Sequence, residues 1–293
     1  MMSEVVLNTG DTAWMLMSCA LVLLMTPGLA LFYGGMVRAK GVLNMMMMSF
    51  ISMGIVSILW VLYGYSMSFG KDLGGGFLGN PFEMFGLTDQ IASDSFFGTI
   101  PTSVFVAFQA MFAVITVALI SGAIADRAKF GGWIVFVVVW STVVYFPVAH
   151  WVFDFDSGDN DPGGWIANQL KAIDFAGGTA VHINAGIAAL AAALVLGKRA
   201  GFGREAFKPH NLTLVMIGAG LLWFGWFGFN AGSAVASNAT AGITFLNTFV
   251  ATGAAMLAWL IVEKIRDGRA TSLGAASGVV AGLVAITPSC SSV

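Results

Sequence analysis

Charged residues are scarce in this chain of 293 residues, at 10%, whereas 58% of its residues are hydrophobic. Soluble globular proteins carry about 25% charged and roughly 45–50% apolar residues. A chain with so few charges cannot cover a soluble fold with polar surface, which excludes a soluble enzyme and a disordered protein. The net charge of −2 provides no basic field for a polyanion, so a nucleic-acid partner is also excluded. The remaining class is an all-α polytopic membrane protein in a lipid bilayer.

Cysteine and histidine are also rare, with two and three residues respectively. Two cysteines exclude a disulfide scaffold, and no CxxC or His/Cys cluster indicates a zinc site. A serine between small residues, Ser277, suggests an intramembrane protease, but that chemistry requires a histidine base after the serine and no histidine follows His210. We therefore expect no enzyme activity, no metal and no cofactor.

Long apolar stretches dominate the chain and predict eight membrane-spanning helices, because about 20 apolar residues cross a bilayer. Their Gly, Ala and Ser content is typical of helices that pack against one another in lipid. No charged or proline-rich tract divides the chain, so we expect a single membrane domain over residues 1–293. The predicted spans are 12–33, 43–69, 100–124, 131–153, 175–197, 211–234, 241–263 and 272–290.

Basic residues are distributed unevenly between the loops. Of the 13 Lys and Arg residues, 11 follow odd-numbered spans and only Lys71 and Lys171 follow even-numbered ones. The positive-inside rule therefore places the N-terminus outside the membrane. Four acidic residues lie in one loop on the predicted outer side. They are Asp154, Asp156, Asp159 and Asp161.

The fifth stretch, DFAGGTAVHINAG at 174–186, places His182 within the membrane, roughly 10 Å from its outer end at 1.5 Å per residue. Gly178, His182 and Gly186 share one face of an α-helix, so the glycines leave space around the imidazole. An ionisable residue at this depth is a functional candidate. Two interpretations stay open: the imidazole lines a lumen, or it is buried and hydrogen-bonded at a close helix crossing.

Asp174, at the start of this stretch, either caps the helix or presents its charge to a cation. The other two histidines, His150 and His210, lie near the ends of spans, and we expect them to be surface or interface residues.

Aromatic residues recur in two other spans. In the sixth, Gly225, Phe229 and Ser233 share one face near the outer end, and the third carries Phe112. An aromatic stripe usually packs in a core or faces lipid, and the spacing alone does not indicate a site.

Several long strings in the chain resemble the ammonium transporter (Amt/Mep/Rh) family, in particular its bacterial Amt branch. The matching strings are TPGLALFYGGMVR (26–38), SGAIADRAKF (121–130), DFAGGTAVHINAG (174–186), KRAGFGREAFKPHN (198–211), WFGFNAGSA (226–234) and LGAASGVVAGLVAITPSC (273–290). Together they extend over almost the whole chain.

The resemblance implies a homotrimer in the inner (plasma) membrane, with one pore in each subunit. Ammonium is recruited at an outer aromatic vestibule, gives up its proton, and crosses a hydrophobic pore lined by two histidines. The residues implied to recruit ammonium are Phe112, Phe153, Ser233 and Asp174. Phe112 and Phe229 are implied to form the phenylalanine gate. His182, as the first of the two histidines, and Trp226 are implied to line the pore.

These residue types suit that mechanism. An aromatic face attracts a cation by about 0.5–2 kcal/mol as water leaves, and Ser233 can accept an N–H bond. Carrying an intact ion through hydrocarbon costs far more than this, so passing a neutral molecule is favoured. Potassium has no proton to lose, which implies its rejection.

The chain departs from the family pattern at two points. Phe153 stands where the family has a vestibule Trp, which implies weaker recruitment unless Trp151 substitutes. The family has eleven spans in two inverted repeats and a final helix, whereas this sequence ends in the eighth, before the second histidine and the tail that helps dock the PII signalling protein. We therefore expect weak or no transport by this chain. The alternatives are a non-conducting ammonium sensor or interaction subunit, and an inactive fragment.

Overall fold

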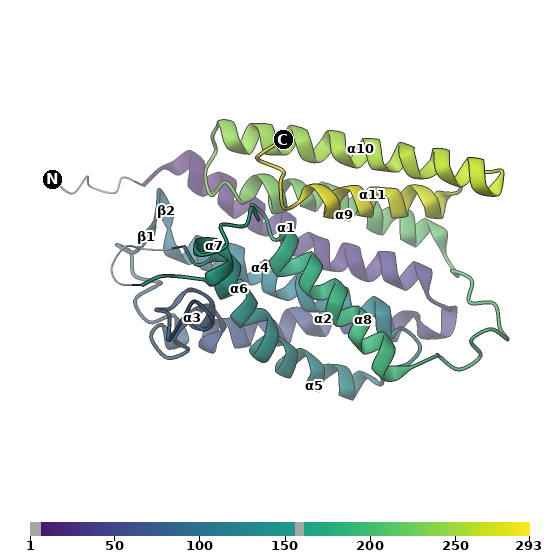
Figure 1. Ribbon diagram of the computed structural model, residues 1–293, viewed down its shortest axis with the longest axis horizontal. Helices are drawn as coiled ribbons and strands as arrows, with labels where there is room; N and C mark the ends of the chain where they lie inside the picture. The colour runs from purple at the N-terminus through teal and green to yellow at the C-terminus, as the bar shows by residue number, and fades with distance from the viewer. Residues whose placement is uncertain (1–6, 156–160) are drawn as a thin grey trace.

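The computed structural model describes residues 7–155 and 161–293, which form a bundle of roughly parallel and antiparallel helices (Figure 1). The helices are α1 (Thr9–Met36), α2 (Val42–Leu59), α3 (Tyr65–Phe69), α4 (Thr102–Ile120), α5 (Phe130–Trp140), α6 (Phe146–Phe153), α7 (Trp165–Asn168), α8 (Asn184–Leu196), α9 (Leu212–Gly232), α10 (Ala239–Asp267) and α11 (Ser272–Ile286). Short 3-10 segments are η1 (Ala39–Gly41), η3 (Phe85–Leu87) and η4 (Ser121–Ile124), and π-helical segments are η2 (Trp60–Gly64), η5 (Ser141–Tyr145) and η6 (Gly178–Ile183). A two-stranded hairpin pairs β1 (Phe96–Phe97) with β2 (Ile100–Pro101).

The prediction of an all-α membrane protein is confirmed, and the helices follow the predicted spans closely. Within the described residues, seven helical segments are long and apolar enough to cross a membrane. The eighth predicted span forms α11, which has 15 residues and ends at Ile286, two residues before Pro288. Because a helix rises 1.5 Å per residue, α11 is only about 22 Å long. It is therefore shorter than the roughly 30 Å hydrocarbon core.

Three of the spans contain a π-helical turn that the sequence analysis did not predict. The segments η2 and η5 interrupt the second and fourth spans, and η6 opens the fifth. A π-helical turn contains an extra residue, so side chains four apart no longer lie directly above one another. The common face that we expected for Gly178, His182 and Gly186 is therefore displaced within η6.

The centre of the bundle is built on the close packing of α1 against α9. At Gly218, a Cβ atom would lie 2.4 Å from the backbone nitrogen of Phe32 and 2.6 Å from the Gly28 carbonyl oxygen. Only glycine allows the two backbones to approach so closely, as in other membrane helix pairs. The α1–α9 pair thereby positions the aromatic side chains of α9 toward α4 and η6.

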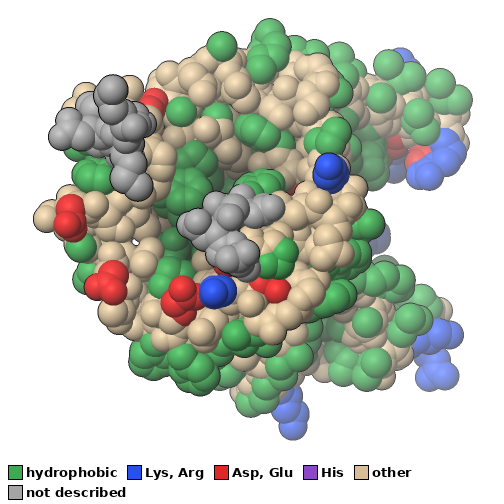
Figure 2. Space-filling view, turned by 60° about the vertical axis from the view of Figure 1, so that its left-hand side comes forward, with side chains coloured by type: hydrophobic (Ala, Val, Ile, Leu, Met, Phe, Trp, Pro, Cys, Tyr) green, Lys and Arg blue, Asp and Glu red, His purple; other side chains and the backbone are tan. Residues whose placement is uncertain are grey.

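The two ends of the bundle differ in charge. At one end, Arg38 contacts Asp126 and Glu205 at 3.0 Å each, and Arg199 lies 4.0 Å from Asp126. The loops after the first, third and fifth predicted spans therefore meet at this end, which we call the basic end. The opposite end carries the β-hairpin and α7, and acidic side chains are spread over it in Figure 2.

At this opposite end, His150 is fully buried, and our expectation of a surface or interface histidine was wrong. Its Nε2 lies 3.2 Å from the Asp72 carboxylate, and its Nδ1 lies 3.4 Å from that of Asp154. The loop that follows α3 folds back over α6 and covers the ring. Burial, together with the charges of Asp161, Asp72 and Glu83, raises the pKa of Asp154 to about 7. Asp156 and Asp159 of the predicted acidic loop lie outside the described residues.

Candidate functional site

Aromatic rings from three helices meet near the end of the bundle opposite the basic end. The rings of Phe112 on α4 and Phe229 on α9 are stacked, with centroids 4.2 Å apart and an interplanar angle of 23°. Phe153, the last residue of α6, meets Phe112 edge-on at 6.3 Å. The exposed fractions of Phe112 and Phe229 are 1% and 0%, so the stack closes the space between the two helices.

His182 and Trp226 lie directly beyond this stack. The imidazole is stacked on the Trp226 indole at 5.2 Å and lies 5.8 Å from the Phe229 ring. Its Nε2 is buried and has no hydrogen-bond partner in the structure. A buried ring nitrogen without a partner is unusual, since an unsatisfied polar group is destabilising. This unpartnered nitrogen makes His182 a candidate contact for a small polar molecule.

A cavity of about 40 Å³ adjoins these rings. It has room for at least one molecule of the size of water. Its walls are apolar apart from the His182 imidazole, the Trp226 indole and the Tyr33 phenol. The lining residues are Met25, Leu29, Phe32, Tyr33, Ile115, Leu119, His182, Leu222, Trp226, Phe229, Val280 and Val284.

Asp174 positions the segment that carries His182. Its two carboxylate oxygens accept four backbone N–H bonds, from Gly177 (2.7 Å), Gly178 (2.7 Å), Thr179 (2.6 Å) and Ala180 (3.3 Å). This is the geometry of a helix cap, and it agrees with the first of the two interpretations that the sequence left open. The negative charge is thus placed at the start of η6, on the side of the aromatic stack.

The expected space beside His182 exists on one side only. At Gly186 a Cβ atom would meet nothing within 4 Å, but at Gly178 it would lie 2.5 Å from the Pro288 ring. Pro288 follows α11, and its carbonyl oxygen accepts a 2.9 Å bond from the Phe175 backbone nitrogen. Our expectation of open space at Gly178 was wrong, because α11 ends against η6 and its proline fills that space.

Thr287 connects the same segment to the aromatic group. Its hydroxyl accepts a 2.9 Å bond from the Trp226 indole nitrogen and donates one of 2.7 Å to the Leu283 carbonyl oxygen. Neither Thr287 nor Pro288 was predicted from the sequence as part of the site. The only signal was a proline after an apolar run, which marks the end of a helix without showing what it contacts.

Ser233 lies one turn beyond Phe229, at the end of α9. Its hydroxyl donates a 2.8 Å bond to the Phe229 carbonyl oxygen. The hydroxyl proton of Ser233 is therefore already used in a hydrogen bond, whereas the lone pairs of its oxygen can still accept one. A group with free lone pairs beside aromatic faces suits a ligand that carries N–H donors and positive charge.

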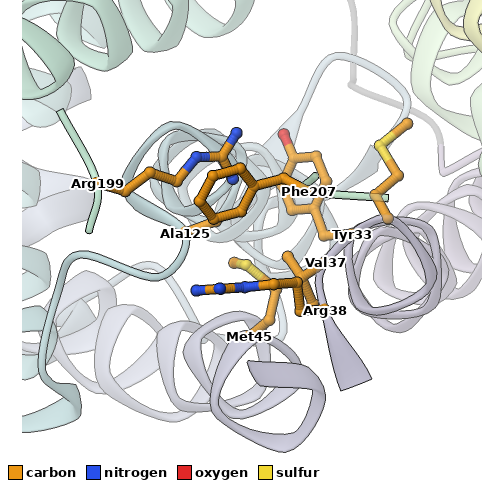
Figure 3. Close-up of a pocket in the computed structure, with 9 residues that line it drawn as sticks. Tyr33, Val37, Arg38, Met45, Ala125, Arg199 and Phe207 are labelled. Carbon is orange, nitrogen blue, oxygen red and sulfur yellow. The ribbon is translucent and has the colours of Figure 1, made fainter. Parts of the chain in front are cut away.

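Tyr33 on α1 is a third residue that was not predicted from the sequence. It lines both the His182 cavity and a larger pocket of about 290 Å³ at the basic end. Its hydroxyl donates a 2.8 Å bond to the Leu119 carbonyl oxygen. The pocket walls include Arg38 and Arg199, whose guanidinium groups lie 4.5 and 4.3 Å from the Phe207 ring centroid (Figure 3). Tyr33 is therefore the side chain shared by the cavity and the pocket.

The chain is similar to known proteins both in sequence and in fold. The model of the Ammonium Transporter Family matches residues 13–293. The ammonium transporter of Mycobacterium tuberculosis H37Rv is 64% identical over 97% of this chain and 62% of its own length. That of Aquifex aeolicus is 50% identical over 98% of this chain and 64% of its own. The chain thus spans less than two thirds of the length of these relatives.

Two solved structures have a similar fold. The crystal structure of Saccharomyces cerevisiae Mep2 superimposes with a TM-score of 0.88 at 34% identity, covering 98% of this chain and 64% of Mep2. A structure described as a sensor Amt protein gives a TM-score of 0.85 at 29% identity, covering 96% of this chain and 69% of the other.

Proposed function

Because this chain belongs to the ammonium transporter family, we propose that it moves ammonium across the membrane by stripping the ion of its charge. Ammonium is recruited beside Phe153, Phe112 and Ser233 and gives up its proton to water on the outer side. The neutral ammonia passes the Phe112–Phe229 gate and crosses past His182 and Trp226. The observation that carries this proposal is the unpartnered His182 Nε2 at an apolar cavity directly beneath a stacked phenylalanine pair.

Recruitment follows from the chemistry of the outer group. A cation over the Phe153 or Phe112 face gains about 0.5–2 kcal/mol, and Ser233 accepts one of its N–H bonds. The Asp174 carboxylate, held at the start of η6, adds a negative charge on the same side. Its bonds to four N–H groups keep that charge fixed in place, so Asp174 contributes through its field.

Deprotonation follows from the dry interior. The cost of placing a charge in an apolar cavity exceeds what the aromatic faces supply. A neutral molecule avoids that cost. A neutral imidazole has one donor and one acceptor nitrogen, so His182 can bind ammonia without trapping it. Potassium cannot lose its charge and stays outside.

Uptake of radiolabelled methylammonium into liposomes that contain the chain tests the proposal. In line with the expectation of weak transport, we expect methylammonium uptake that is low but above that of empty liposomes. We also expect no uptake of potassium, and loss of the methylammonium uptake in His182→Ala. Ile187→Ala is the matched control, because Ile187 is exposed on α8 away from the cavity. Uptake that is identical in His182→Ala and Ile187→Ala would contradict the proposal.

A second candidate is a non-conducting ammonium sensor, which is favoured by the likeness to the structure described as a sensor Amt protein. It predicts saturable methylammonium binding to the purified chain that depends on Ser233, with no uptake above empty liposomes. Binding and uptake measured on the same preparation distinguish the two functions.

The assembly and partners of the chain belong to the same proposal. We propose a homotrimer in the inner membrane with the N-terminus outside and the basic end in the cytoplasm, where the PII signalling protein binds. The distribution of Lys and Arg supports this orientation. The apolar, largely exposed surface of α10 supports an interface with a second subunit. Cross-linking of the chain in liposomes, read as a ladder of one to three subunits, tests the trimer.

A further inference from the structure

A second hollow, separate from the His182 cavity, lies between α5 and α8 and measures about 570 Å³. It shares no lining residue with that cavity. One wall carries the aromatic rings of Trp133, Phe136 and Trp140, and the other carries small and aliphatic residues of α8. The lining residues are Ile120, Ile124, Arg127, Ala128, Lys129, Gly132, Trp133, Phe136, Trp140, Ala188, Ala191, Ala192, Val195 and Leu196. We call this hollow the α5–α8 groove.

The charge of the groove is confined to its basic end. Arg127 and Lys129 are its only charged lining residues, and the lining contains no carboxylate. Among the described residues, no acidic side chain lies within 4 Å of either cation. Arg127 also lines an adjoining hollow of about 350 Å³ together with Lys198 and Arg199. Arg127 and Lys129 therefore have no carboxylate partner at this end of the groove, whereas Arg199 is paired with Asp126.

Two further observations favour an anion at this end of the groove. The Arg127 guanidinium donates to the carbonyl oxygens of Ala123, Ala193 and Gly197, but its Nε is buried and has no partner. Lys129 is the N-cap residue of α5, whose first turn contains no acidic residue. A cation at the positive end of a helix dipole is unfavourable unless an anion binds between them.

The length of the groove matches one leaflet of a bilayer. From Lys129 to Trp140 the α5 axis rises about 16 Å at 1.5 Å per residue. Half of the hydrocarbon core is roughly 15 Å thick. A phosphate held at the basic end therefore leaves an acyl chain of ordinary length to lie along Trp133, Phe136 and Trp140.

We propose that the α5–α8 groove binds one anionic phospholipid, with its phosphate at Arg127 and Lys129 and an acyl chain along the aromatic wall. Basic pockets between membrane helices are suited to such head groups. The groove and the His182 cavity share no lining residue, so this proposal does not rest on ammonium transport.

Photocrosslinking in liposomes tests this proposal. The probes are phosphatidylglycerol and phosphatidylcholine that carry a diazirine in the acyl chain, and the cross-linked peptides are identified by mass spectrometry. We expect phosphatidylglycerol to label the peptides of α5 and α8 that line the groove about fivefold more than phosphatidylcholine does.

Two pairs of variants test separately where the acyl chain binds, along the aromatic wall, and where the phosphate binds, at the basic end. A Cβ atom at Gly132 or at Gly131 would meet nothing within 4 Å, but only Gly132 lines the groove. Gly132→Leu should therefore remove the labelling, and Gly131→Leu should retain it. Lys129→Gln should lower phosphatidylglycerol labelling about fivefold and leave phosphatidylcholine unchanged. Lys264→Gln, on α10, should change neither.

Three results would overturn the proposal. Equal labelling by the two lipids removes the anion preference. Equal labelling of Gly132→Leu and Gly131→Leu would show that the acyl chain does not lie in the groove. Cross-links between two copies of the chain through the groove, lost in Gly132→Leu, assign the groove to a subunit interface instead.

Discussion

The contact between Gly178 and Pro288 yields the sharpest prediction about how His182 is positioned. In Gly178→Ala the new Cβ atom would lie 2.5, 2.6 and 2.7 Å from three carbons of the Pro288 ring. Because ordinary carbon contacts are near 3.5–4 Å, either η6 or the proline must move by about 1 Å. The proline ring is joined to the backbone, so it cannot turn aside as a flexible side chain would.

The magnitude follows from the cost of overpacking. Inserting a methyl group into a filled site costs roughly 1–3 kcal/mol. The matched control is Gly186→Ala, two turns along the same span, where the new methyl group meets nothing within 4 Å. There alanine should stabilise the helix by about 0.5–1 kcal/mol.

The assay is the thermal unfolding midpoint of each purified variant in detergent, measured by intrinsic tryptophan fluorescence. The two variants should differ by about 1.5–4 kcal/mol, so we expect Gly178→Ala to unfold roughly 3–16 °C below Gly186→Ala, at about 2–4 °C per kcal/mol. Methylammonium uptake should fall as well, because Phe175 and Trp226 are bonded to Pro288 and Thr287. Equal midpoints for the two variants would refute the claim that α11 fixes η6.

Other parts of the site give four further predictions. Ser233→Ala should weaken methylammonium binding about 2–10-fold, since it removes one net hydrogen bond, and titration calorimetry measures this. Phe153→Trp should tighten binding about 2–5-fold in the same assay, because indole is the better cation–π partner. Thr287→Val should lower the free energy of unfolding by roughly 1–3 kcal/mol, because the buried Trp226 N–H loses its acceptor; chemical denaturation measures it. The pKa of Asp154 is raised from 3.8 to about 7. The protonated carboxyl group therefore contributes fully to stability below pH 4, and this contribution is lost as the pH rises to 7. Thermal unfolding midpoints measured over pH 4–8 should fall in the parent chain and change less in Asp154→Asn.

Much of the fold could be predicted from the sequence because membrane helices are defined by length and hydropathy alone. The predicted stretch 241–263 corresponds to α10 (Ala239–Asp267), and 211–234 to α9 (Leu212–Gly232). The π-helical segments could not be predicted, since they depend on neighbours rather than on local composition. The segment η6 is held by the Asp174 carboxylate and by Pro288, which lies 110 residues away along the chain from Gly178.

The candidate site was predicted in part. Phe112, Phe229, Trp226 and His182 were all singled out from the sequence, and the structure brings their rings together. The spacing of Phe229 and Ser233 could not distinguish a gate from core packing, because that distinction depends on contacts between helices.

Three residues with structural roles were not predicted from the sequence, namely His150, Tyr33 and Thr287. The burial of His150 was missed because loop residues such as Asp72 fold back over it, and loop paths are not encoded in helical periodicity. The roles of Tyr33 and Thr287 depend on carbonyl and indole partners that are remote in sequence.

The central claim is that the amine leaves its proton behind and passes His182 as a neutral molecule. The most direct test records the internal pH of liposomes that contain the chain and a trapped pH dye while methylammonium is added outside. If a neutral amine enters and takes up a proton inside, the interior becomes alkaline at the rate of uptake, and His182→Ala abolishes both changes. Uptake of labelled methylammonium without any rise in internal pH would contradict the claim.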